Sequence, residues 1–71
     1  MEEAATVHDP PARAMLRDWL QKNERPATWL ARQMDVSPEI VRMWLKDSVP
    51  TIGNAAKIQA VTGIPVGAWA E

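Results

Sequence analysis

The side chains most able to bind a charged partner are the cations of this chain. It has eight Lys and Arg residues, a single histidine (His8) and no cysteine. Without thiolates, and with one imidazole, the common zinc ligand sets cannot be assembled. No nucleophile, base and orienting residue stand at a recognisable spacing, and no glycine-rich phosphate loop is present. We therefore expect no enzyme activity, no metal or other cofactor, and no small-molecule ligand.

These cations are concentrated in the body of the chain. The formal net charge is −1, but four of the nine acids lie at or near the ends. Between residues 10 and 70, eight cations face five acids, so this segment carries +3. Such an excess permits a basic face and a nucleic-acid partner without proving either.

The segments that carry these cations are predicted to be helices. Six prolines divide the chain into stretches of 12 to 15 residues, and proline is favoured in the first turn of a helix. Phe and Tyr are absent, and no run of alternating β-branched residues supports a strand. The sequence predicts an all-α fold of five short helices. Residues 1–8 are expected to form a flexible tail that includes His8, and residues 9–71 a single domain.

Apolar residues at helical spacing predict which sides face the core. In the first helix the inward residues are Ala12, Met15, Leu16, Trp19 and Leu20, whereas Arg13 and Arg17 fall outside this stripe. In the second and third helices they are Leu30, Ala31, Met34, Val41, Trp44 and Leu45. In the fourth they are Ile52, Ala55, Ile58 and Val61.

Side chains typical of helix ends predict where these helices begin and stop. Asp9, Ser37 and Thr51 are expected to cap the first, third and fourth helices, because their oxygens can accept from free N–H groups. Gly63 is expected to end the fourth helix, and a last turn is expected over residues 65–69.

The stretch from Ala27 to Lys46 is the most informative for function. Two short helices meet over residues 34–37, a link too short for the helices to lie antiparallel, which is typical of a helix-turn-helix. Ala31 is small where the helices should cross. Asp35 stands where the chain must leave a helix through a left-handed residue, a conformation that Asp tolerates.

This stretch resembles the helix-turn-helix of the Cro and phage-repressor (XRE-type) regulators. The similar pieces are Leu30-Ala31-Arg32, Val36-Ser37-Pro38, Val41, Arg42, Trp44 and Leu45. Residues 16–23 resemble the family's first helix, and residues 50–65 its fourth helix and exit, so the resemblance covers roughly residues 12–69. It implies a compact five-helix lambda-repressor-like domain that inserts its third helix into the major groove of an operator. The implied function is a sequence-specific transcriptional regulator in the bacterial cytoplasm or nucleoid.

The resemblance also implies which residues meet the bases of double-stranded DNA: Ser37, Pro38, Glu39, Arg42 and Met43. Among them Arg42 could make a bidentate contact with guanine, worth about 1–3 kcal/mol of discrimination. Glu39 could accept from cytosine, Met43 could touch a thymine methyl group, and Ser37 could bind a phosphate at the helix start.

Contacts with DNA phosphates are expected from Arg13, Arg17, Arg25, Thr28, Arg32 and Lys46. The chain departs from the family pattern at four places that usually supply polar or basic contacts. Ala27 and Pro38 stand where the family often has glutamine, Asp47 replaces a turn glycine, and the loop at 48–49 carries no cation. Each departure removes a contact with DNA, so we expect either weak binding at physiological salt or a different partner for this surface.

The apolar end of the chain, Ile64, Val66 and Trp69, is expected to be too large for the domain to bury alone. In Cro-like proteins this region often supports dimerisation, and we expect a homodimer through these three residues. Such a dimer would present two recognition helices about one DNA turn apart, ~34 Å.

A second interpretation is a protein-interaction module on the same fold, such as an anti-repressor, an antitoxin or an adaptor. The acidic net charge, Glu39 and the missing loop cations favour it, as does the expected exposure of Trp29 and Trp69. Trp29 is equally consistent with a contact to the tail, to a partner or to the first helix.

The acidic start is unlike a secretory signal, and the longest uncharged run near the C-terminus has thirteen residues where a membrane span needs about 18. We expect no membrane association and a cytoplasmic location.

Overall fold

The computed structural model describes residues 9–70, and the regular structure in this range is helical. Four α-helices, α1 (Pro11–Lys22), α2 (Ala27–Met34), α3 (Pro38–Lys46) and α4 (Ile52–Thr62), precede a 3₁₀ helix, η1 (Val66–Trp69). The prediction of an all-α fold without strands is confirmed over the described residues, with η1 as a short 3₁₀ element at the end. The predictions for His8 and for a tail over 1–8 lie outside the described range.

Three predicted helix ends are confirmed by their hydrogen bonds and dihedral angles. The Ser37 Oγ accepts from the Ile40 N–H at 3.3 Å and caps α3, and the Thr51 Oγ1 accepts from the Asn54 N–H at 3.3 Å and caps α4. Gly63 ends α4 in the left-handed region, with φ at 85°.

The predicted cap of α1 is wrong. Pro10 occupies the N-cap position and makes no side-chain cap bond, and the Asp9 carboxylate instead accepts from Arg13. Because Pro10 and Pro11 have no N–H, the first turn of α1 offers fewer free donors for a capping carboxylate.

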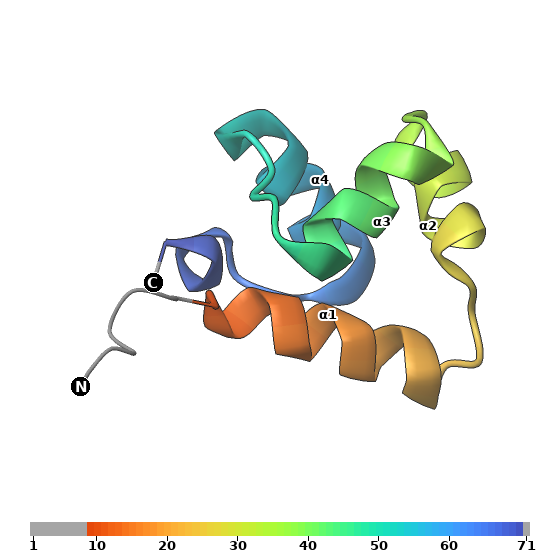
Figure 1. Cartoon of the computed structure of the whole chain (residues 1–71), viewed down its shortest axis with the longest axis horizontal. Coiled ribbons are helices and arrows are strands. Elements are labelled where there is room, and N and C mark those ends of the chain that lie inside the picture. Colours follow the sequence, from red (N-terminus) through yellow and green to blue (C-terminus); the bar gives the residue numbers. More distant parts are fainter. Residues whose placement is uncertain (1–8, 71) are drawn as a thin grey trace.

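The helices are arranged so that α1 runs along one side of the molecule, with α3 and η1 packed against it (Figure 1). The first turn of α1 lies beside η1, which brings the two ends of the described chain together. Helix α2 packs mainly on α3, and α4 packs mainly on α2 and η1. The twelve buried apolar residues form one core: Ala12, Leu16, Leu20, Leu30, Ala31, Met34, Val41, Trp44, Ala55, Ile58, Ile64 and Trp69.

Three predictions about inward residues are wrong. Met15 is 41% exposed, whereas Arg13 is buried, so the buried arc of α1 is rotated toward Arg13 relative to the prediction. Ile52 is 80% exposed because it is the first residue of α4, beyond the faces that pack on α2 and η1. Three other residues predicted inward, Trp19, Leu45 and Val61, are half-buried against the core.

Candidate nucleic-acid interface

Helices α2 and α3 are joined by a tight turn in which the chain changes direction sharply (Figure 1). Asp35 adopts the left-handed conformation predicted for it, with φ 58° and ψ 46°. The Val36 N–H then donates to the Ala31 carbonyl at 3.0 Å, which closes the turn. Ala31 is only 1% exposed, as expected for a small residue at a close approach of two helices.

The side of α3 turned away from the core carries the residues predicted to meet bases. Ser37, Glu39, Arg42 and Met43 are exposed, and Pro38 is half-buried. The Arg42 Nη1 lies 3.9 Å from the Glu39 Oε2, and both side chains are well exposed, so this ion pair contributes little and leaves Arg42 free to exchange partners. Sequence reasoning missed Ile40, which is 38% exposed beside these residues, although it falls outside the predicted inward stripe of α3.

Helix α2 brings two of the predicted phosphate contacts next to the start of α3. Thr28, Arg32 and Pro38 line one open hollow of about 320 Å³, together with Ala31 and Val36. Thr28 and Arg32 are four residues apart and therefore share a face of α2. The hollow places a hydroxyl and a guanidinium beside the first residue of α3.

Arg25 is held in place by an aromatic stack. Its guanidinium lies 4.9 Å from the centre of the Trp29 ring, within the range of a cation–π contact. Trp29 in turn stacks on Trp19 of α1, with ring centres 5.9 Å apart and planes 25° from parallel. Of the contacts considered for Trp29, the structure therefore shows the one with the first helix. Arg25 remains exposed in the link that precedes α2.

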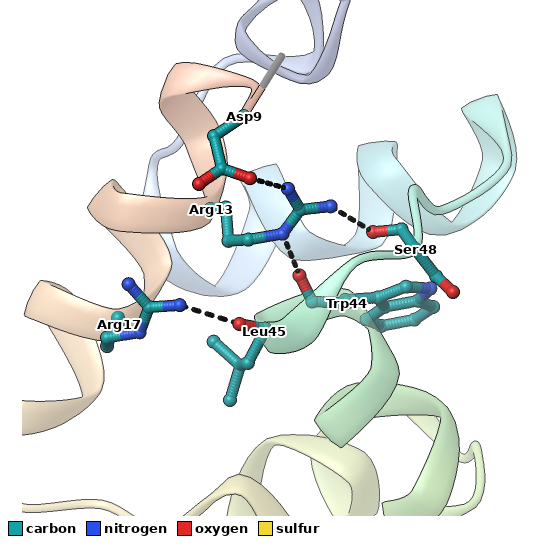
Figure 2. Close-up of polar contacts among 6 residues, drawn as sticks. All are labelled: Asp9, Arg13, Arg17, Trp44, Leu45 and Ser48. Atoms are coloured by element: carbon teal, nitrogen blue, oxygen red, sulfur yellow. Dashed lines mark hydrogen bonds and ion pairs between the residues drawn. The ribbon is translucent and has the colours of Figure 1, made fainter. Parts of the chain in front are cut away.

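Arg13 and Arg17, the two predicted phosphate contacts on α1, are directed at the carboxyl end of α3 (Figure 2). The Arg13 Nε donates to the Trp44 carbonyl at 2.9 Å, and its Nη2 donates to the Ser48 carbonyl at 2.8 Å. Its Nη1 donates to the Asp9 carboxylate. Arg13 is 3% exposed with all three nitrogens engaged, so the prediction that it contacts phosphate is wrong.

Arg17 lies one turn further along α1, and its Nη2 donates to the Leu45 carbonyl at 2.6 Å. Arg17 is exposed, as is Lys46 at the last position of α3. Because Arg17 contacts Leu45 and Lys46 is the last residue of α3, both cations lie at the end of α3 opposite to Ser37. The sequence contained no signal for the contacts of Arg13 and Arg17 with α3, because their acceptors are backbone carbonyls about 30 residues away.

Two of the three residues predicted to form a dimer interface are buried within the single chain. Ile64 is 4% and Trp69 is 5% exposed, because η1 folds back onto α1 and α4. For these two residues the prediction is wrong, whereas Val66 is half-buried. Val66 lines an apolar hollow of about 270 Å³ together with Val49, Pro50, Ile52, Ala55, Gly67, Trp69 and Ala70. Sequence reasoning missed Val49, which is 53% exposed at its rim.

Among residues 9–70, no three His, Cys, Asp or Glu side chains are grouped so that they could hold a metal ion. No helix in that range is both long enough and apolar enough to cross a bilayer.

No protein family, curated protein or solved structure was found to match this chain.

Proposed function

We propose that this chain is a small sequence-specific DNA-binding transcriptional regulator of the Cro and phage-repressor (XRE) type. In this proposal α2, the turn at Asp35 and α3 form a helix-turn-helix, η1 is the fifth helix of a lambda-repressor-like domain, and α3 enters the major groove. The observation that carries the proposal is the exposed side of α3, where Arg42 stands free of the core between Glu39 and Met43.

The dimensions of α3 fit this role. Nine residues at about 1.5 Å each make a rod of roughly 14 Å, and the major groove, about 12 Å wide, admits one α-helix. Arg42 can then offer two parallel donors to the O6 and N7 of guanine. Met43 and the exposed Ile40 can touch thymine methyl groups.

Phosphate contacts are supported on both flanks of α3. Arg25, Thr28 and Arg32 lie on the α2 side, where Arg25 is already held over Trp29 and loses little freedom on binding. Arg17 and Lys46 lie at the other end of α3. Contacts of this kind fix the protein on the duplex without reading its sequence.

The test uses the duplex most strongly enriched by the wild-type protein from a randomised library, compared with a shuffled duplex. We expect log K to fall with log salt by about 0.9 for each phosphate contacted, and Arg42→Ala to lower the preference for the enriched duplex by about five- to 150-fold. Lys57→Ala removes the same charge from α4 and serves as the matched control. Equal affinity for both duplexes at low salt, or an equal loss in the two variants, would refute the proposal.

Binding to a two-fold operator would use a homodimer, and we propose that the second copy docks on the apolar rim of Val49, Ile52 and Val66. These residues replace Ile64 and Trp69 as the dimer surface, since they are the ones that remain accessible. A domain of 71 residues buries only about 60% of its unfolded surface, so covering Ile52 in a dimer would add to a thin folded margin. The site of action would be the bacterial cytoplasm or nucleoid, where the DNA is.

A second candidate function is a protein-interaction module on the same fold, such as an anti-repressor, an antitoxin or an adaptor. It is favoured by the exposed apolar residues on and after α3, in particular Met43, Val49 and Ile52, and by Glu39, which repels phosphates. Capture of a host protein that is lost in Ile52→Ser, with folding intact and with no preference for any duplex, would favour this function. Trp29 and Trp69 are poor choices for this test because both pack within the chain.

A further inference from the structure

The two arginines of α1 hold the carboxyl end of α3 by its backbone. Arg13 and Arg17 are four residues apart, so they project from the same side of α1. Their guanidinium groups donate to the carbonyls of Trp44 and Leu45, both in the last turn of α3 (Figure 2). Arg13 also donates to the carbonyl of Ser48, in the loop that leads to α4. We call this pair of arginines and its carbonyl acceptors the α1 clamp.

The end of a helix is the place where such a clamp has most effect. The last four carbonyls of an α-helix have no partner within it, and they form the negative end of its dipole. In α3 the Met43 carbonyl accepts from the backbone N–H groups of Asp47 and Ser48. The next two carbonyls in sequence are those that accept from Arg13 and Arg17. Each bond therefore satisfies a carbonyl that has no partner within the helix. Because a hydrogen bond depends on angle, each bond also restricts the orientation of α3.

The clamp supplies what apolar packing does not. Val41 and Trp44 bury α3 against the core, but hydrophobic contact is non-directional and tolerates small rotations and shifts. The amino end of α3 is fixed by the turn at Asp35 and by the Ser37 cap. Charge-assisted hydrogen bonds at the carboxyl end fix a second point, and two fixed ends define the direction of a helix.

We infer that Arg13 and Arg17 are positioning residues that set the direction of α3, and through it the bases that Arg42 and Met43 reach. This inference rests on the proposed function. Arg13 is buried and all its nitrogens are engaged, so it contributes to sequence preference without contacting DNA. Loss of the Arg13 bonds should therefore lower the preference for the enriched duplex while leaving the affinity for the shuffled duplex almost unchanged. Loss of Arg17 also removes a proposed phosphate contact, so it should lower the affinity for both duplexes as well as the preference between them.

The experiment compares Arg13→Met, Arg17→Met and Lys22→Met with the wild-type chain. All three variants remove one positive charge from α1, but Lys22 pairs only with the exposed Asp18 at 3.5 Å and makes no contact with α3 among the bonds of the described residues. The first measurement needs no DNA: residual dipolar couplings of backbone amides report the direction of α3 relative to α2. The second is the ratio of affinities for the enriched and the shuffled duplex.

We expect both arginine variants to change the direction of α3 and to lower the affinity ratio by about tenfold, within the range of one impaired bidentate base contact. Lys22→Met should leave the couplings unchanged. It should also leave the affinity ratio within about twofold of wild type, since an exposed ion pair contributes little. If Arg13→Met does not fold, Arg17→Met, whose side chain is exposed, decides the outcome.

Two failures are distinguishable. Unchanged couplings in the arginine variants overturn the clamp as a positioning device, whatever the DNA measurements give. Absence of sequence preference in the wild-type chain refutes the proposed function, while the couplings still report whether the clamp sets the direction of α3. A tenfold loss of preference in Lys22→Met as well would also overturn the inference, because charge alone would then explain the result.

Discussion

Replacing Arg13 with methionine should be among the most destabilising single changes on the surface of α1 that faces α3. The substitution keeps an unbranched apolar stem but removes the donors that serve the Trp44 and Ser48 carbonyls. A buried acceptor left without a partner costs about 1–3 kcal/mol, and the part-buried Ser48 carbonyl costs less than the buried Trp44 carbonyl, so the two together cost about 2–5 kcal/mol. Removing the buried charge offsets part of this loss of stability, because the desolvation penalty of the guanidinium disappears. We expect a net loss of about 3 kcal/mol.

This loss is large relative to the stability of so short a chain. At about 0.05–0.15 kcal/mol per residue, 71 residues correspond to roughly 4–11 kcal/mol. Urea denaturation followed by tryptophan fluorescence provides the assay. With an m-value of about 1 kcal/mol/M, the midpoint should fall by about 3 M.

Methionine substitutions at Arg17 and Lys22 show how the loss of stability depends on the burial of the replaced side chain. Arg17 is exposed and makes one bond to α3, so Arg17→Met should cost only about 1 kcal/mol. Lys22→Met, which loses an exposed ion pair, should cost less than about 0.5 kcal/mol. Equal losses at Arg13 and Arg17 would show that burial and the additional acceptors do not matter, and the reasoning would then be wrong.

Three further predictions concern other parts of the chain. Asp35→Gly should raise the urea midpoint slightly and Asp35→Ala should lower it, because the left-handed backbone there costs roughly 1–2 kcal/mol for a residue with an ordinary side chain and little for glycine; a lower midpoint for the glycine variant would contradict this. Trp29→Ala should remove the coupled signal of the stacked indoles from the circular dichroism spectrum and destabilise the fold by about 1–3 kcal/mol, whereas an unchanged spectrum would mean that Trp19 and Trp29 do not stack in solution. Ile52→Asp should weaken self-association measured by light scattering while leaving the unfolding of the monomer within about 0.5 kcal/mol, since Ile52 is 80% exposed, and an unaltered oligomeric state would exclude this rim as the dimer surface.

The parts of the fold that depend on local chemistry could be predicted from the sequence. Ser37 and Thr51 cap helices because their own oxygens reach N–H groups three residues ahead. Asp35 and Gly63 adopt left-handed conformations because the chain leaves a helix at each of them. The outward position of Arg42 follows from the period of α3, since Val41 and Trp44 occupy the buried side.

In the candidate site, the sequence predicted the residues whose exposure follows from helical periodicity. Residues on the outer side of α3 and on the exposed face of α2 could be placed from periodicity, as the positions of Arg42 and Arg32 illustrate. Arg13 could not, because periodicity treats an arginine as a residue of the solvent-facing side, and only acceptors from a distant helix make its burial tolerable.

Interactions within a few residues specify the helical class, the starts of α3 and α4, the end of α4 and the tight turn between α2 and α3, so these could be read from the sequence. The packing of helices decided the rest. It rotated the buried arc of α1 toward Arg13, enclosed Ile64 and Trp69 beneath the returning chain, and left Ile52 exposed. These outcomes depend on which surfaces meet across the fold, and hydrophobic and charge patterns specify the surfaces of a helix without specifying the partner that covers them.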